Sequence, residues 1–388
     1  MWPSTAAASP STGFKAITDL NQSGEFDYEL PGLKVNLSER KVMTEKVAHT
    51  VRFEPVGIEI EVDEDETVLE AAFRQGVSLM HGCKEGQCAS CKSVLCNGDV
   101  ELLKYSTFAL SDTEREQDRI LLCRTIAYSD LVIELLNFDE GLLARSIPVR
   151  TFDARITSIE SLTHDIRRLE ILTDQPLRFW AGQYVDITVP ESGVTRSFSM
   201  ANPPSQPNTL EFIIKIYPQG AFSSLLKEKL RHGDPIEIKG PYGSCLRHEN
   251  RPGSMILVGG GSGMAPLLSI LTDLVESGEQ RPVRFFYGAR TKHDLFMLDR
   301  IEELGLRLRD FSFIPALSGP GIEADWVGET GFIHEVLGRH LQGEFLDGEA
   351  DAYSCGPPPM IDAVLPVLQM SGLEPENIHF DKFTAAVR

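Results

Sequence analysis

The pattern of apolar and polar positions divides the chain into segments with different periods. Residues 50–55 and 57–62 alternate apolar and polar side chains, which is typical of a half-buried β-hairpin. Thr67 is a suitable N-cap for a helix over residues 68–75, and Gly76 is a suitable terminator. This first segment therefore predicts a small unit with both strands and helices.

Short strands separated by turns follow the segment 142–148, which we interpret as a linker. They are predicted at 152–160, 167–172, 183–189, 210–217 and 234–243, with a helix over 224–230. This spacing is typical of a small antiparallel barrel.

Strands and helices alternate from Ser254 onward. Buried strands are predicted at 255–258, 283–290, 311–315 and 352–355, and helices at 267–276, 298–304 and 360–370. Such alternation indicates a parallel α/β sheet. The expected fold class is multidomain, α+β followed by α/β, with domains at 47–140, 148–250 and 251–388.

Residues 1–46 differ from the rest. They begin with an Ala/Ser/Thr/Pro-rich stretch and show no sustained apolar period, so we expect disorder. Two alternatives stay open: a partner-docking arm, or an extension upstream of a natural start at Met43. No basic stretch leads into an apolar run, so no signal peptide is expected. The uncharged run 252–272 contains Pro266 and the four glycines Gly259, Gly260, Gly261 and Gly263 close together, which favours a strand, loop and helix over a membrane span.

The charge of −20 argues against a nucleic-acid partner, whose phosphates require a basic surface. Residues 47–140 contain 8 Lys or Arg against 19 Asp or Glu, a formal charge of −11. A field of this sign could steer a partner with a basic docking surface. The seven cysteines show no disulfide-framework spacing, which favours a reducing, cytoplasmic compartment.

Four of these cysteines form the most specific motif of the chain. Cys83, Cys88 and Cys91 have C-x4-C-x2-C spacing, and Cys123 follows with 31 residues between. This is the plant-type [2Fe–2S] pattern, in which the thiolates hold the cluster. With the surrounding strands and helix, it predicts a β-grasp ferredoxin domain. A zinc site is the alternative, although zinc sites usually have two short cysteine pairs.

Two further features bear on this cluster loop. Gly82 and Gly86 would let backbone amides approach the cluster closely. Cys96 is a rival fourth ligand, but we expect it to be a buried thiol on a strand that points away from the loop.

Three other motifs are candidates for nucleotide binding. The turn from Gly259 to Gly263 lies between a predicted strand and a helix, where small residues admit a pyrophosphate. Arg196-Ser-Phe-Ser199 combines a guanidinium, an aromatic face and two hydroxyls. Cys355-Gly-Pro lies at the carboxyl end of a predicted parallel strand, where open α/β sheets bind ligands. Each could instead be an ordinary turn or strand.

The order of the four motifs resembles the ferredoxin–NADP reductase-like flavoproteins with an N-terminal plant-type ferredoxin, which are reductase components of bacterial oxygenases. Over residues 47–388 the chain is most similar to reductases of soluble di-iron monooxygenases of the methane and propane type. The resemblance implies FAD, NADH and a [2Fe–2S] cluster as cofactors. It also implies a di-iron hydroxylase as partner, and we expect a monomer with no membrane association.

The resemblance implies roles for individual residues as well. Arg196 would bind the FAD pyrophosphate, Phe198 would flank the isoalloxazine, and Ser199 would lie near its N5. Cys355 and Asp381 would join Ser199 in positioning and polarising the reactants, so these three are the candidate catalytic residues. The full candidate cofactor set is Arg196, Ser197, Phe198, Ser199, Gly220, Phe222, Ser223, Gly259, Gly260, Gly261, Gly263, Cys355, Gly356, Pro357 and Phe383.

The predicted function is electron transfer from NADH through FAD and the cluster to an external acceptor. Flavin accepts a hydride and releases single electrons, so it must stand between the two-electron donor and the one-electron cluster. The basic Arg290-Thr-Lys-His segment could favour NADPH, but the resemblance favours NADH. Alternative functions are a reductase for a Rieske-type dioxygenase and an acidic docking protein with structural zinc. Ala89 departs from the family, which usually has glycine there.

Overall fold

The computed structural model describes residues 47–319, 325–342, 346 and 348–383. The predictions made for residues 1–46, disorder, a docking arm or a start at Met43, concern residues outside this described part.

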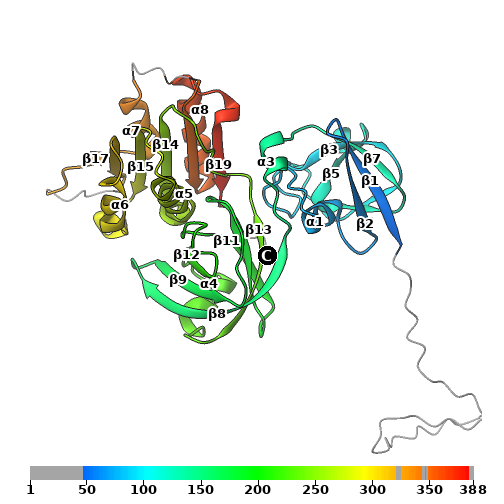
Figure 1. The fold of residues 1–388 in the computed structure, drawn as a ribbon, viewed down its shortest axis with the longest axis horizontal. Coiled ribbons are helices and arrows are strands. Elements are labelled where there is room, and N and C mark those ends of the chain that lie inside the picture. Colours follow the sequence, from blue (N-terminus) through cyan, green and yellow to red (C-terminus); the bar gives the residue numbers. More distant parts are fainter. Residues whose placement is uncertain (1–46, 320–324, 343–345, 347, 384–388) are drawn as a thin grey trace, which may run out of the picture. The chain divides into compact units, whose positions relative to one another are not determined.

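A five-stranded mixed sheet forms the first unit, in the order β2-β1-β7-β3-β5 (Figure 1). The predicted hairpin is confirmed as antiparallel β1 and β2. The elements are β1 (Ala48–Glu54), β2 (Ile58–Asp63), α1 (Val68–Arg74), β3 (Lys92–Asn97), β4 (Val100–Leu102), α2 (Asp112–Arg115), β5 (Arg119–Leu121), η1 (Leu122–Arg124), β6 (Thr125–Ala127) and β7 (Leu131–Leu135).

The helix α1 begins where the sequence predicts. The Thr67 hydroxyl accepts a hydrogen bond from the Glu70 amide at 3.3 Å, and the Glu70 carboxylate accepts one from the Thr67 amide at 3.0 Å. This reciprocal cap satisfies two amides that the helix leaves free. The apolar face of α1 is buried in the core of the first unit.

The segment interpreted as a linker contains a helix, α3 (Glu140–Ala144), so that interpretation was incomplete. Asp139 caps it by accepting a hydrogen bond from the Leu142 amide at 2.9 Å. Leu142 is buried. Its packing stabilises this helix of five residues, which is too short to be stable through helix propensity alone.

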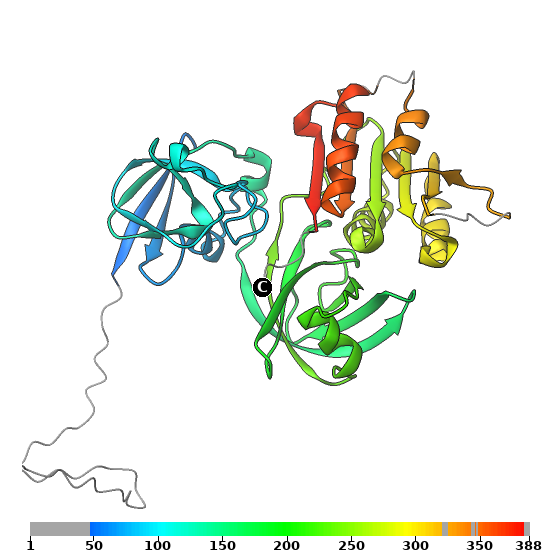
Figure 2. The ribbon, with the colours of Figure 1, turned by 180° about the vertical axis from the view of Figure 1, so that it is seen from behind.

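A curled antiparallel sheet in the order β11-β10-β13-β8-β9-β12 follows (Figure 2). A bridge between Met200 and Phe212 joins its two ends, which agrees with the predicted barrel. The helix α4 starts at Ala221, three residues before the predicted start. The elements are β8 (Arg150–Ser161), β9 (Ile166–Thr173), β10 (Tyr184–Val189), β11 (Val194–Ser199), β12 (Thr209–Lys215), α4 (Ala221–Glu228) and β13 (Pro235–Tyr242).

The last sheet is parallel throughout, in the order β17-β16-β15-β14-β18-β19. Helices α5 and α6 cover one face and α7 and α8 the other (Figure 1). The elements are β14 (Met255–Gly260), η2 (Gly261–Gly263), α5 (Met264–Ser277), β15 (Val283–Ala289), η3 (Lys292–Asp294), α6 (Leu298–Gly305), β16 (Phe311–Leu317), β17 (Glu329–Thr330), α7 (Ile333–His340), β18 (Asp351–Gly356), α8 (Pro358–Met370), η4 (Pro375–Asn377) and β19 (Ile378–Lys382).

The start of α5 corrects the sequence-based boundary. We expected the helix to begin at Leu267 because of Pro266, but it begins at Met264. Pro266 falls in the first turn, where the missing amide hydrogen would have no intrahelical partner. In the parallel sheet and its helices, β17, α7 and β19 were not predicted from the sequence.

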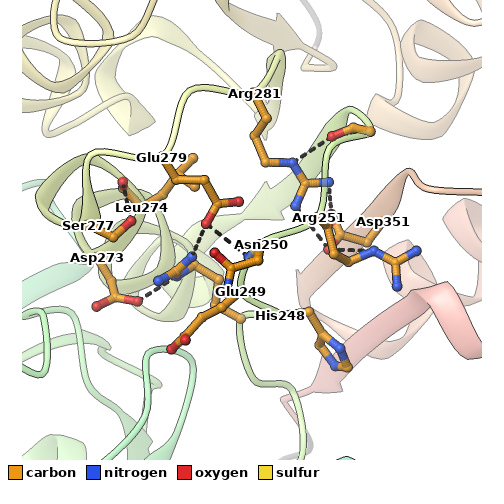
Figure 3. A network of polar contacts seen from close by, with 12 residues as sticks. His248, Glu249, Asn250, Arg251, Asp273, Leu274, Ser277, Glu279, Arg281 and Asp351 are labelled. Atoms are coloured by element: carbon orange, nitrogen blue, oxygen red, sulfur yellow. Dashed lines mark hydrogen bonds and ion pairs between the residues drawn. The ribbon is translucent and has the colours of Figure 1, made fainter.

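Ion pairs fix the connection between the curled and parallel sheets (Figure 3). Arg247, which is buried, pairs with Asp273 at 2.5 Å and with Glu279 at 3.0 Å, both near the end of α5. Arg281 pairs with Asp351 at 2.8 Å. Arg281 also donates to the Gly253 carbonyl at 2.6 Å, so its contacts hold the start of β14 against its neighbours β15 and β18. Within the described residues, no helix combines the length and apolarity needed to cross a membrane.

Candidate functional site

The four candidate cluster ligands lie in one region of the first unit. Cys83, Cys88 and Cys91 belong to the loop between α1 and β3, and Cys123 lies in η1. The Sγ atoms of Cys91 and Cys123 are 3.3 Å apart. The Cys83 and Cys88 thiols are also hydrogen-bonded to each other, and the amide of Cys83 donates to the Cys88 sulfur at 3.2 Å.

Backbone amides of the loop point toward the sulfurs. Those of Glu85 and Gln87 donate to the Cys83 Sγ at 3.4 and 3.1 Å. Hydrogen bonds, the largest from the Cys83 thiol, lower the pKa of Cys88 to about 5. The same hydrogen bond raises the pKa of Cys83, and the contact between Cys91 and Cys123 lowers the pKa of Cys91 and raises that of Cys123. Each pair of thiols thus holds one thiol that favours the thiolate, and four sulfurs arranged in this way fit the chemistry of a [2Fe–2S] cluster.

Two glycines make the tight loop possible. A Cβ at Gly82 would lie 3.0 Å from the Cys88 sulfur. Gly86 has φ +70°, and a Cβ there would lie 2.8 Å from the Tyr105 Cβ. Ala89 also has a positive φ of 61°, a conformation that costs an alanine about 1 kcal/mol.

Cys96 lies on β3, as expected, but it is exposed rather than buried. Its nearest described polar contact is the carbonyl oxygen of Val94, 3.9 Å from the sulfur. The expectation of a buried thiol was therefore wrong, because the end of β3 leaves the core.

The Arg196-Ser-Phe-Ser199 motif forms β11, at the edge of the curled sheet. The Phe198 ring packs on that of Phe222 in α4, with centroids 4.8 Å apart. The Arg196 Nη1 donates to the Thr195 carbonyl at 2.6 Å, and its side chain is partly exposed. Strand β11 thus carries both the guanidinium of Arg196 and the ring of Phe198, and α4 packs against that ring.

Gly220 is the N-cap of α4, and Ser223 lies in its first turn. The Ser223 hydroxyl accepts a hydrogen bond from the Tyr217 amide at 3.0 Å, which orients it toward the helix start. A Cβ at Gly220 would lie 3.1 Å from the Ser223 Oγ. The start of α4 is thus open to a phosphate only while residue 220 is small.

The glycine-rich turn follows β14, the strand at which the chain order of the parallel sheet reverses. A Cβ at Gly260 would lie 2.8 Å from the Met360 sulfur, and one at Gly263 would lie 1.9 Å from the Cys355 carbonyl oxygen. Close packing therefore requires glycine at position 263, where the near atom is backbone, whereas at position 260 a Cβ would displace the flexible Met360 side chain. The crevice beside such a switch point is the general place for ligands in open α/β sheets.

Ser199, Cys355 and Asp381 come from three strands and meet. Cys355 and Asp381 are paired across β18 and β19. The Ser199 hydroxyl, from β11, hydrogen-bonds to the Asp381 carboxyl, and burial raises the pKa of that carboxyl to about 6. The Phe383 amide donates to the Gly356 carbonyl at 2.9 Å, and Pro357 is the N-cap of α8. The parallel sheet thus contributes to the same place as Arg196–Ser199 of the curled sheet, the segment predicted to bind flavin and called the flavin motif below.

Sequence reasoning missed two sets of contacts near this place. Cys245, which belongs to none of the sequence motifs, has its sulfur 4.0 Å from that of Cys355. Lys84, in the cluster loop, pairs with Asp186 of β10 at 2.6 Å. Neither contact has a local sequence motif, because each joins residues more than 100 positions apart.

The fold and this arrangement define the class of protein: a pyridine-nucleotide reductase that combines a flavin-binding sheet, a nucleotide-binding sheet and a ferredoxin unit. Family models agree with each part. Residues 51–128 match a 2Fe-2S iron-sulfur cluster binding domain, 153–246 an oxidoreductase FAD-binding domain, and 257–365 an oxidoreductase NAD-binding domain.

Relatives specify the family further. The chain is 48% identical, over 87% of its length and 92% of the relative, to the reductase component of propane 2-monooxygenase from Rhodococcus jostii (strain RHA1). It is 46% identical to that of Gordonia sp. (strain TY-5), over 87% and 97%. Among solved structures, an Amycolatopsis cytochrome P450 reductase, GcoB, superposes with a TM-score of 0.79 at 29% identity, over 87% of this chain and all of that one.

The chain belongs to the family of reductase components of multicomponent monooxygenases, which carry electrons through FAD and a 2Fe-2S cluster. It is an oxidoreductase with NAD-, FAD- and cluster-binding parts. The relatives favour the monooxygenase interpretation over the Rieske dioxygenase alternative.

Proposed function

We propose that this chain transfers electrons from NADH to the hydroxylase component of a di-iron hydrocarbon monooxygenase and does so as a monomer. The observation that supports the proposal best is the meeting of Ser199, Cys355 and Asp381, which brings the flavin motif and the nucleotide-binding sheet to one place. The matches to propane monooxygenase reductases support the kind of partner.

The residues that would hold the cofactors are those predicted from the sequence. FAD, when bound, would supply the conversion of a hydride into two single electrons. Arg196 would bind its pyrophosphate, and Phe198, braced by Phe222, would support the ring system. Ser199 would donate to the ring, and Asp381 would orient the Ser199 hydroxyl. Gly259–Gly263 and Cys355 would leave room for the pyrophosphate and the nicotinamide.

The four thiolates of Cys83, Cys88, Cys91 and Cys123 would hold the [2Fe–2S] cluster. The three proposed domains are 47–140, 148–250 and 251–388, and each contains one of the family-model matches. The acidic charge of residues 47–140 supports a partner with a basic docking surface.

The proposal favours NADH over NADPH. Lys292, which together with Arg290 could attract a 2′-phosphate, donates to the Asp325 carboxylate at 2.7 Å. A lysine with a carboxylate partner attracts a further anion less strongly, and the carboxylate itself repels it. The ratio of kcat/KM for NADH and NADPH tests this, and a preference for NADPH would contradict it.

The decisive experiment is reduction of purified oxygenase components by the complete protein with NADH. We expect the hydroxylase of a propane-type di-iron monooxygenase to be reduced and to turn over, and the oxygenase of a Rieske dioxygenase to be reduced much more slowly. Equal or reversed rates would contradict the proposed partner. A colourless preparation after iron, sulfide and FAD have been supplied would contradict the function itself.

A further inference from the structure

Lys84 has an unusual position for a lysine. It lies within the cluster loop, between Cys83 and Cys88, and has a positive φ of 57°. Its side chain turns away from the loop, toward the curled sheet, and is only 19% exposed. A long cationic side chain is rarely this buried without a specific partner.

The partner is Asp186 of β10. The Lys84 ammonium donates to the Asp186 Oδ2 at 2.6 Å, and the carboxylate is only 18% exposed. The same ammonium lies 3.6 Å from the centroid of the Tyr242 ring and 5.1 Å from that of Tyr184. An ion pair and two cation–π contacts therefore meet at one nitrogen.

The carboxylate of Asp186 also connects to the flavin motif. Asp186 faces Ser197 across the β10–β11 pair, and the Ser197 hydroxyl donates to its Oδ1 at 2.6 Å. The Oδ2 atom of Asp186 thus accepts from the cluster loop, and its Oδ1 atom accepts from β11, the strand that contains Arg196 and Phe198. The cluster loop and the flavin motif are linked through a single side chain.

Apolar and backbone contacts surround this ion pair. The Gly243 amide donates to the His81 Nε2 at 3.3 Å, and the Phe73 and Tyr242 rings pack with centroids 5.3 Å apart. Tyr184 and Tyr242 are buried in the same core as the residues of the first unit. The ring packing is non-directional and the hydrogen bond to His81 is long, whereas the Lys84–Asp186 pair joins two fixed points at 2.6 Å. Charged pairs at such junctions determine register more than affinity.

We propose that Lys84 is a positioning residue that fixes the cluster loop in one orientation against the flavin motif, and so sets the rate of electron transfer between them. The inference rests on the proposed function. One NADH yields NAD+, a proton and two electrons, which two one-electron acceptor equivalents take up. Lys84 takes no part in that chemistry; it fixes the separation and orientation of the two redox centres.

The test compares Lys84→Met with Lys84→Arg and with a matched control, Lys92→Met. Lys92 is also a mostly buried lysine beside the cluster cysteines, 15% exposed, but its ion pair at 2.5 Å is with Glu114 of the same unit. Asp186→Asn breaks the pair from the other side and leaves the cluster loop unaltered, in case Lys84→Met fails to fold.

Two measurements are made on the complete protein. Stopped-flow spectroscopy follows flavin reduction and cluster reduction separately after mixing with NADH. We expect Lys84→Met and Asp186→Asn to slow cluster reduction by about tenfold or more, since small misplacements have effects of this size. Lys84→Arg should retain most of the rate of cluster reduction, because the arginine guanidinium can reach the Asp186 carboxylate.

Hydrogen–deuterium exchange provides a readout that does not depend on activity. Amides of residues 82–91 should exchange faster in Lys84→Met and Asp186→Asn than in the unmodified protein, and in Lys92→Met exchange should change only around α2. If Lys84→Met slows cluster reduction no more than Lys92→Met does, the proposal is overturned. If the unmodified protein shows no flavin reduction by NADH, the proposed function fails instead.

Discussion

The sulfur of Cys91 lies 3.3 Å from the sulfur of Cys123, although 32 positions separate the two residues. Strand pairing explains this contact. Lys92 of β3 faces Leu121 of β5, and the Leu122 amide donates to the Cys91 carbonyl at 3.1 Å. The sheet therefore delivers a fourth thiol to the three that the loop supplies.

This geometry predicts different outcomes for two serine substitutions. Cys123→Ser should lose the iron–sulfur absorbance, or most of it, because the thiolate is replaced by a weak ligand. Cys96→Ser should retain it, because Cys96 is exposed on β3 and has no described contact with the other four thiols. The visible spectrum and iron content of the two purified variants check this. Cys123→Ser should still show flavin reduction by NADH but pass no electrons onward.

The reverse result, cluster loss in Cys96→Ser and retention in Cys123→Ser, would show that the ligand assignment is wrong. Loss in both variants would point to misfolding of the first unit. Circular dichroism of the apoproteins separates these outcomes.

The backbone conformation of Ala89 predicts that glycine at this position stabilises the cluster loop. Its φ of 61° is in the left-handed region, where glycine has no steric penalty. Ala89→Gly should stabilise the folded loop by about 1 kcal/mol, which corresponds to a rise of about 4 °C in the temperature at which a domain of this size unfolds. The measurement is the midpoint for thermal loss of iron–sulfur absorbance.

A matched control is Ala71→Gly in α1, where the backbone is helical and the methyl is buried. That change should lower the midpoint, since glycine costs a helix about 1 kcal/mol relative to alanine. A lower midpoint for Ala89→Gly as well would mean that the methyl contributes contacts that outweigh its backbone strain.

Much of the fold could be predicted because it is determined by local patterns. The alternation in β1 and β2, the cap at Thr67 and the change of period near Ser254 are all visible in short windows. The cluster loop could be predicted because ligand spacing is fixed by coordination chemistry. The class of protein also followed from the order of the motifs, and the family models agree with it.

The rest depended on contacts between distant residues. Strand β19 contains Phe380 and Asp381, but its polar, short sequence becomes a strand only because β18 offers it a free edge. The helix α3 is stabilised by burial of Leu142, not by propensity. The Lys84–Asp186 pair and the contact between Cys245 and Cys355 exist only after the sheets have formed.

The ion pair between Arg281 and Asp351 predicts a large loss of stability on substitution. Their side chains are 1% and 0% exposed, and Arg281 also donates to the Gly253 carbonyl at 2.6 Å. Arg281→Met leaves the Asp351 carboxylate buried without its main partner, which should cost about 3 kcal/mol. Chemical denaturation of the complete protein measures the change.

The exposed pair of Arg284 and Asp310 provides the control. Its side chains are 36% and 52% exposed, and the shortest contact is 2.7 Å. Arg284→Met should cost less than about 1 kcal/mol, as is usual for surface pairs. Similar losses in the two variants would contradict the view that burial, rather than the ion pair alone, determines the cost.

The raised pKa of Asp381 predicts that the stability of the flavin-free protein depends on pH. Burial raises the pKa of this carboxyl to about 6, against an ordinary value of 3.8. The folded state therefore binds the proton more tightly than the unfolded state does. The stability that this proton provides is complete below pH 4 and is lost as the pH rises through about 6.

Asp381→Asn removes the ionisation but keeps the shape of the protonated side chain. At pH 7 the variant should be more stable than the unmodified protein by about 2 kcal/mol, and at pH 4 the two should be equally stable. Denaturation at a series of pH values provides the comparison. Asp362→Asn, at a carboxylate that is 61% exposed, should leave the pH dependence unchanged. A stability difference between Asp381→Asn and the unmodified protein that stays constant from pH 4 to 7 would show that Asp381 acts through its shape, with no contribution from its proton.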